Sequence, residues 1–318
     1  MKTLLSLLCA TSLLHATQPV EVFNLDKSTS VQQSFQAEEL QFPHPILEIK
    51  QPKSAYVTMG LALVPGLGHT YLGEWKTAGG LFGTTCGAIG AATIPGTSDS
   101  FKLNSIITAQ NTWSYGIFAA YRDVRIYNGQ RGYQYKMPTD SIASLTSAPF
   151  QLSVLKKPEV WGGFIGAIAL GIGTSYLAFP QEAAIRTNLS STMQISPFAA
   201  LPVGVGEEAF FRGFLQSGLS EYFTPWGGIA LSSLAFGAVH MPNAMALAPE
   251  HRWRYYTFSV PLITAFGAYF GWMTQKNHSL QPSVALHTWY DFVIFAANAL
   301  ATRASITSRA DFQFSSDF

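Results

Sequence analysis

Charged residues are scarce in this chain. Asp, Glu, Lys and Arg make up 12% of its 318 residues, about half the share of roughly 25% found in soluble globular domains. The two signs nearly balance, with a formal net charge of +1, so nothing in the composition suggests nucleic acid as a partner. Aromatic residues reach 14% and the mean hydropathy is +0.18. This composition predicts an all-α protein, a bundle of helices that crosses a membrane several times.

Cysteine is equally rare, with two residues in the whole chain. Cys9 lies in the apolar leader and Cys86 in an apolar segment, so we expect no disulfide. Two thiols are also too few for a metal site made of thiolates.

The first residues have the pattern of a secretory signal. One lysine precedes the apolar stretch 4–14, and the small residue Ala16 follows it. We expect 1–16 to be a signal peptide, and an uncleaved membrane anchor is the alternative. Residues 17–53 are polar with scattered prolines, which predicts an extracytoplasmic arm with little core of its own.

About eight apolar segments follow, and each is expected to be a membrane helix. Three form an N-terminal membrane module within 54–121, and five lie within 158–300. The segments are 56–71, 81–94, 106–121, 160–179, 198–219, 226–241, 255–274 and 283–300. Between the two groups lies the basic segment 122–157, which the positive-inside rule predicts to be a cytoplasmic loop. A polar tail, 301–318, ends the chain.

The first two segments form a tight hairpin. Pro65-Gly66-Leu67-Gly68 interrupts the first, and Gly73-Glu74-Trp75-Lys76 connects it to the second. This hairpin resembles the small two-helix modules with a PGLGxxYLG turn found in many bacterial membrane proteins. We expect His69, beside the turn, to be a turn or interface histidine and not a metal ligand.

Three sets of polar residues interrupt the later apolar segments. They are Glu207, Glu208 and Arg212 in the second of the five, His240 at the end of the third, and His287 with Asp291 in the last. A charge at the centre of a membrane helix costs at least about 2.5–3.5 kcal/mol, so such residues usually face one another or a water-filled cavity. Glu208 and Arg212 are spaced i, i+4, as are His287 and Asp291, and each pair shares a helix face. Together the sets supply the acids and imidazoles of a hydrolytic centre.

The order and spacing of these sets resemble a known family. Glu-Glu-x-x-x-Arg, Phe-x-x-x-His and His-x-x-x-Asp occur in this order on separate predicted helices, which is similar to the CPBP family of intramembrane proteases, also called the Abi or CAAX-protease family. The resemblance covers roughly 155–300. It implies a peptidase that acts on a membrane-associated protein or peptide, and membrane lipid as a further partner. It also implies a multi-pass location in a cell membrane, here a bacterial-type inner membrane because of the leader. It does not imply that the substrate is prenylated.

The resemblance also implies roles. Glu207 would be the general base that activates water, with Glu208 and Arg212 as its support and His240 as a partner. His287 and Asp291 would bind the oxyanion or a metal. An ionised Asp291 accepts hydrogen bonds and cannot donate one to an oxyanion, which favours a cation. Zinc with Glu208, His240, His287 and Asp291 as ligands is one version; a neutral Asp291 in a metal-free glutamate protease is the other.

Less specific interpretations exist for each set. Glu208 and Arg212 alone would be a structural ion pair, His240 alone a helix-end histidine, and His287 with Asp291 a core pair. At the level of the whole protein, the alternatives are a non-catalytic membrane protein of the bacteriocin-immunity type and a transporter, since acids within the membrane also mark ion paths.

Overall fold

The computed structural model describes residues 51–178 and 194–316, with the backbone alone at 246 and 301–316. The expected signal peptide, 1–16, and nearly all of the arm, 17–53, lie outside the described residues. Lys53–Phe318 forms one compact unit. Every element within the described ranges is helical and none is a strand, which confirms the all-α prediction for this part of the chain.

The elements follow one another as helices of very different length. The N-terminal helices are α2 (Ala55–Leu61), α3 (Leu67–Leu72), α4 (Trp75–Ala92) and α5 (Asp99–Tyr127). The next four are α6 (Ile142–Ser147), η1 (Ala148–Phe150), α7 (Leu152–Leu155) and α8 (Pro158–Ala178). Then come η2 (Pro197–Ala199), α9 (Ala200–Glu208), η3 (Ala209–Leu215), α10 (Gln216–Tyr222) and α11 (Pro225–His240). The last are η4 (Met241–Ala246), η5 (Pro249–His251), α12 (Arg252–Arg254), η6 (Tyr255–Ser259), α13 (Val260–Asn277) and α14 (Gln281–Ser316).

Side-chain caps and prolines set several of these boundaries. The hydroxyl oxygens of Ser98 and Thr224 accept hydrogen bonds from the amides of Phe101 and Gly227, at 3.2 and 3.1 Å, and so satisfy free amides at the starts of α5 and α11. Pro225 occupies the first turn of α11, where its fixed φ suits a helix start.

The predicted interruption of segment 56–71 is confirmed: the segment is two short helices, α2 and α3, and Gly66 adopts φ 80° between them. Two other boundaries differ from the sequence-based expectation. The predicted loop 122–157 begins inside α5, and it contains α6, η1 and α7. Arg122 and Arg125 are therefore buried helix residues paired with Asp123 and Glu221, and not solvated loop charges. The last helix, α14, continues past its expected end at Leu300.

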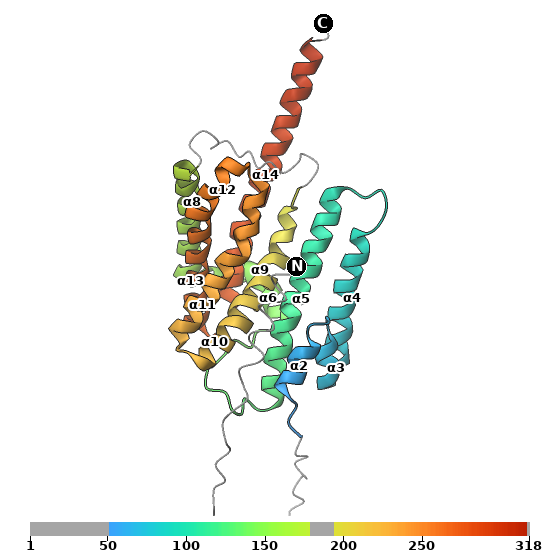
Figure 1. Ribbon diagram of the computed structural model, residues 1–318, viewed down its shortest axis with the longest axis vertical. Helices are drawn as coiled ribbons and strands as arrows, with labels where there is room; N and C mark the ends of the chain where they lie inside the picture. The colour runs from blue at the N-terminus through green and yellow to red at the C-terminus, as the bar shows by residue number, and fades with distance from the viewer. Residues whose placement is uncertain (1–50, 179–193, 317–318) are drawn as a thin grey trace, which may run out of the picture. The chain divides into compact units, whose positions relative to one another are not determined.

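The segment α9–η3–α10 lies among other helices on several sides. It contacts α5 through α9 and η3, α14 through α9, and α11 through η3 and α10. In turn, α5 packs against α4, and α11 packs along α13 (Figure 1). The residues at the α9–η3 junction are therefore enclosed by helices that are far apart in the sequence.

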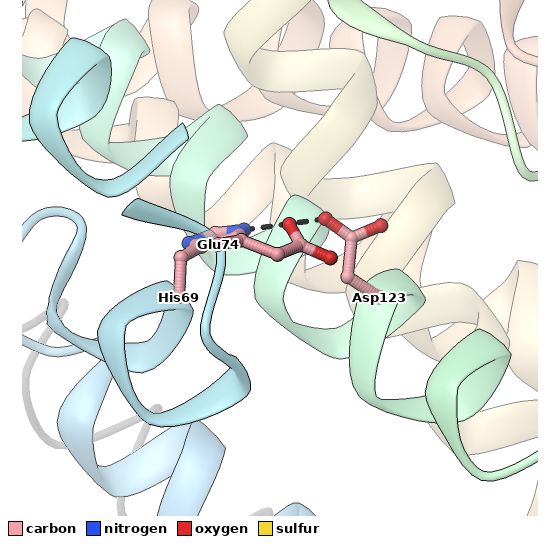
Figure 2. A group of neighbouring side chains, drawn as sticks. All are labelled: His69, Glu74 and Asp123. Carbon is pink, nitrogen blue, oxygen red and sulfur yellow. Dashed lines mark ion pairs between the residues drawn. The ribbon is translucent and has the colours of Figure 1, made fainter. Parts of the chain in front are cut away.

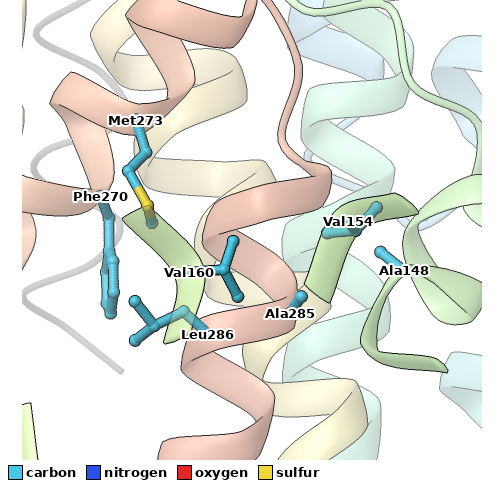
Figure 3. Close-up of a cluster of buried hydrophobic side chains, with 7 residues drawn as sticks. All are labelled: Ala148, Val154, Val160, Phe270, Met273, Ala285 and Leu286. Atoms are coloured by element: carbon cyan, nitrogen blue, oxygen red, sulfur yellow. The ribbon is translucent and has the colours of Figure 1, made fainter. Parts of the chain in front are cut away.

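A cluster of buried apolar side chains supports α13 and α14 near this junction. Figure 3 shows its seven members, Ala148, Val154, Val160, Phe270, Met273, Ala285 and Leu286. They join η1, α7 and α8 to α13 and α14. Phe270 and Leu286 fix the two helices just where α14 presents His287.

One helix among the described residues is long and apolar enough to cross a membrane. It is α8, with 21 residues and a mean hydropathy of 1.4. The predicted count of about eight membrane segments is therefore unconfirmed, and it stays a prediction.

Candidate active site

A buried ion pair lies at the α9–η3 junction. Nη1 of Arg212 lies 3.2 Å from Oε1 of Glu208, and both side chains are fully buried. The guanidinium group also lies over the rings of Phe236 and Phe270, at 4.2 and 5.3 Å from the ring centres. The i, i+4 pairing predicted from the sequence is confirmed. The desolvation of two buried charges offsets much of their attraction. The pair is therefore better explained by its positioning of His287, the other partner of Glu208, than by a contribution to stability alone.

The helix changes its hydrogen-bonding pattern next to the two acids. Residues 209–215 form a π-helix, in which the amide of Gln216 donates to the carbonyl of Phe211 five residues earlier. π-Helical turns are rare, and they occur frequently at functional sites. Here the wider turn follows Glu207 and Glu208 directly and contains Arg212.

His287 on α14 lies among three carboxylates. Its Nδ1 is 2.8 Å from Oε1 of Glu208, and its Nε2 is 3.8 Å from Oε2 of Glu207 and 3.4 Å from Oδ2 of Asp291. A carboxylate oxygen accepts hydrogen bonds, so we assign the proton to Nδ1 of His287, which donates it to Oε1 of Glu208. The other ring nitrogen therefore faces Glu207 and Asp291.

The orientation of this ring is fixed by aromatic packing. Phe270 stacks on His287 with ring centres 5.2 Å apart and planes inclined by 21°, and Phe236 meets the ring edge-on at 6.2 Å. These two phenylalanines also contact Arg212. One aromatic layer therefore holds both the cation that pairs with Glu208 and the imidazole that Glu208 binds.

His240 ends α11 and uses the same arrangement of ring nitrogens. Its Nδ1 donates to the backbone carbonyl of Phe236 over 2.7 Å, since a carbonyl oxygen cannot donate. Its ring packs against Phe236 at 4.7 Å, and the ring of Phe236 in turn meets that of His287 at 6.2 Å. Both imidazoles thus commit Nδ1 to a fixed acceptor and leave Nε2 for other chemistry.

The two glutamates differ in access. Glu208 is fully buried, whereas the Glu207 side chain is 23% exposed and that of Asp291 is 16% exposed. A group that works on water or substrate must be reachable, and a group that holds other residues need not be. The geometry therefore separates Glu207 and Asp291 from Glu208, which lies behind the imidazole of His287.

The side chains at this site are of the types that bind a divalent cation, and metal binding here stays a prediction. Imidazole nitrogens with carboxylate oxygens are typical zinc ligands, and each imidazole is fixed through its other nitrogen, as ligating histidines usually are. Nε2 of His240 and of His287, with the carboxylates of Glu207 and Asp291, are the atoms free for that role. Oε1 of Glu208 already accepts from Arg212 and His287, so the predicted use of Glu208 as a ligand would involve Oε2, which has no hydrogen-bond partner.

The structure also brings in residues that the sequence-based reasoning missed. Asn111 on α5 lies against Gly206, where an added Cβ would come within 2.5 Å of its side chain. Thr288 on α14 is equally close to Gly204. The side-chain oxygens of Asn111 and Thr288 are buried without a hydrogen-bond partner. An amide within the apolar segment 106–121 was the available signal for Asn111; the aromatic role of Phe270 had no such signal.

All six residues expected from the motifs therefore lie around one centre. Glu207, Glu208, Arg212, His287 and Asp291 are joined by the distances given above, and His240 joins them through Phe236. Their catalytic roles stay predictions.

Comparison with protein families finds one matching description. Residues 190–293 match the family described as "Rce1-like: Type II CAAX prenyl endopeptidase Rce1-like". Comparisons with curated proteins and with solved structures find no significant match. The family match covers about a third of the chain and includes all three motifs, but it is shorter at both ends than the expected range 155–300. The chain therefore carries a type II CAAX prenyl endopeptidase Rce1-like domain at residues 190–293, which agrees with the resemblance of its motifs to the CAAX-protease family.

Proposed function

We propose that this protein is an intramembrane endopeptidase that hydrolyses a peptide bond in a membrane-associated protein or peptide. The observation that carries the proposal is the position of His287, held through Nδ1 by a buried glutamate while Nε2 faces two reachable carboxylates. A histidine in a structural core pair has one acidic partner, whereas His287 has three acidic neighbours.

The proposed reaction begins with water bound beside Glu207. The Glu207 carboxylate takes a proton from the water, and the water oxygen forms a bond to the carbonyl carbon of the substrate. The carbonyl oxygen becomes an oxyanion. When the C–N bond breaks, the proton passes from Glu207 to the leaving nitrogen, and the products are a carboxylic acid and an amine, which become a carboxylate and an ammonium group by proton transfer.

His287, Asp291 and His240 act on the oxyanion and the water in this proposal. An Nε2 of His287 that carries a proton donates it to the oxyanion. An Nε2 without a proton instead binds a cation, and a bound zinc ion would polarise the carbonyl and lower the pKa of water. Both versions use the same atoms of this chain, and Glu208 with Arg212 positions them.

We further propose that several helices lie within the membrane, with the site between them. Beyond α8, large apolar side chains are exposed on other helices, for example Phe82 and Ile89 on α4, and Trp226 and Leu234 on α11. Exposed apolar surface of this extent favours contact with lipid or with another protein. A peptide held at the membrane would then reach Glu207 without crossing bulk water.

The test is peptide cleavage by the purified chain in detergent micelles. A quenched fluorescent peptide that ends in a farnesylated CAAX sequence is compared with an unprenylated copy. Glu207→Gln should lower the rate by about 100-fold to 10,000-fold, the usual contribution of a general base. Glu250→Gln, an exposed glutamate in η5, is the matched control and should not change the rate.

Two outcomes would count against the proposal, and two would refine it. Full activity in Glu207→Gln would refute the assigned base. Absence of cleavage in the folded wild-type chain with both peptides would favour the immunity-type alternative. Loss of activity with a chelator, restored by Zn²⁺, supports the metal version, and chelator-resistant cleavage supports the glutamate version.

A further inference from the structure

A second group of metal-type ligands lies in the N-terminal hairpin. His69 on α3, Glu74 between α3 and α4, and Asp123 on α5 place one ligand atom each within 4.8 Å of one another. Figure 2 shows the three side chains converging from these separate elements. Asn111, which contacts Gly206 beside Glu207, precedes Asp123 on the same helix by about 18 Å of helix rise. The group is therefore separate from the candidate active site, and it lies outside the family match.

The imidazole of His69 is buried and has an uncommitted nitrogen. The residue is 1% exposed, and its Nε2 has no hydrogen-bond partner although Oδ2 of Asp123 lies 3.3 Å away. A buried polar atom without a partner is unfavourable by about 1–3 kcal/mol. A ligand between the nitrogen and the carboxylates would satisfy it.

The charges around the group favour a cation. Arg122 already neutralises Asp123, with its Nε 2.7 Å from Oδ1 and its Nη2 3.0 Å from Oδ2. The second carboxylate, Glu74, adds a further negative charge to a half-buried place. Glu74 and Asp123 thus place two carboxylate oxygens within 4.8 Å of each other. A divalent cation among these groups would remove that repulsion.

The local backbone is shaped to present the two hairpin ligands together. Gly66 at φ 80° starts α3, and an added Cβ there would come within 2.3 Å of the carbonyl oxygen of Ala78. Gly73 at φ 86° ends α3, and the amide of Glu74 donates to the carbonyl of His69 over 2.8 Å. The Pro-Gly-Leu-Gly and Gly-Glu segments of the sequence thus hold His69 and Glu74 on the same side of the turn, facing α5.

We propose that His69, Glu74 and Asp123 bind a divalent transition-metal ion of the zinc class. One imidazole with two carboxylates suits zinc better than calcium or magnesium, which prefer oxygen ligands throughout. Zinc–ligand distances of about 2.0–2.2 Å require the ligand atoms to move closer together by about 1 Å. Three protein ligands leave a fourth position for water. The ion would fasten the α3–α4 hairpin to α5, the helix that contacts the candidate active site through Asn111. This reverses the expectation that His69 is not a ligand.

The test is metal binding by the full chain, purified without a tag in detergent and stripped with a chelator. The His287→Ala background is used so that the candidate active site cannot account for the metal. In that background we expect one equivalent of Zn²⁺ per chain by elemental analysis, a Co²⁺ visible absorption spectrum, and a rise in Tm with Zn²⁺ concentration. Adding His69→Gln or Glu74→Gln should weaken binding at least about 100-fold and abolish the rise in Tm. His278→Gln, an exposed histidine, is the matched control and should leave all three signals in place.

The competing explanation is an ion pair between a protonated His69 and Asp123 with no metal. If this explanation holds, the His287→Ala chain binds no Zn²⁺ or Co²⁺, or it binds the ion elsewhere, so that binding survives both His69→Gln and Glu74→Gln. Either result would overturn the proposal. Because His69→Gln could unfold the hairpin, Glu74→Gln provides the decisive measurement: loss of metal with an unchanged Tm in the stripped protein identifies a ligand. The readout is binding, so the result is independent of peptidase activity.

Discussion

Removal of one partner of the Glu208–Arg212 pair is predicted to destabilise the protein strongly, and removal of both is predicted to restore much of the loss. Arg212→Met keeps an unbranched side chain against Phe236 and Phe270 but leaves Glu208 fully buried with His287 as its remaining partner. At 3.2 Å and an effective dielectric constant of about 20, the lost attraction is about 5 kcal/mol. Broken buried pairs cost roughly 3–5 kcal/mol by experiment.

The double variant Glu208→Gln with Arg212→Met tests the origin of that loss. The glutamine oxygen can still accept from Nδ1 of His287, but no buried charge is left without a counter-ion. Replacing both members of a buried pair is often close to neutral. The expected order of stability is therefore wild type, then the double variant, then Arg212→Met.

Thermal unfolding in detergent measures this difference. At about 1.5 °C for each kcal/mol in a chain of 318 residues, Arg212→Met should lower the Tm by roughly 4–8 °C, and the double variant should recover at least half of that. The reasoning is refuted if Arg212→Met unfolds within about 2 °C of wild type, or if the double variant is no more stable than the single one.

Two further predictions concern close backbone contacts. Gly206→Ala places a Cβ 2.5 Å from Asn111, so it should destabilise the protein by about 1–3 kcal/mol through overpacking and lower peptidase activity by separating α9 from α5. Gly218→Ala in α10, whose Cβ would meet its nearest neighbour at 3.9 Å, is the control; equal effects of the two on Tm and rate would contradict this explanation. Gly66→Ala should destabilise the hairpin by at least about 1–2 kcal/mol, because residue 66 has a left-handed φ, and it should also lower the Zn²⁺ affinity. The control is Gly79→Ala in α4, where the added Cβ would meet open space; it should change neither the Tm nor the Zn²⁺ affinity.

Local signals in the sequence predicted much of the helical structure. The segments 160–179 and 226–241 correspond closely to α8 (Pro158–Ala178) and α11 (Pro225–His240). These boundaries depend on nearby residues, such as Pro158, Thr224 and Pro242, and on the length of each apolar run. Local reasoning was wrong where distant partners decide the structure. Arg122 and Arg125 looked like loop charges, but Asp140 and Glu221 with several tyrosines bury them at the end of α5.

In the candidate site too, some features follow from local sequence and others from contacts between distant residues. The spacing of Glu208 with Arg212, and of His287 with Asp291, is a property of one helix, so the sequence determined that each pair would share a face. Which of the two adjacent glutamates would be buried behind the imidazole, and which would stay reachable, depended on where α14 packs against α9.

The sequence by itself therefore determined the helices, their polar positions and the pairs within each helix, because hydrogen bonding along a helix and the cost of burying charge act over a few residues. Only the tertiary structure decided that Glu208 meets His287, seventy-nine residues later, that Phe236 and Phe270 enclose both, and that His69 turns toward Asp123. Those contacts depend on the packing of whole helices, which no spacing along the chain specifies.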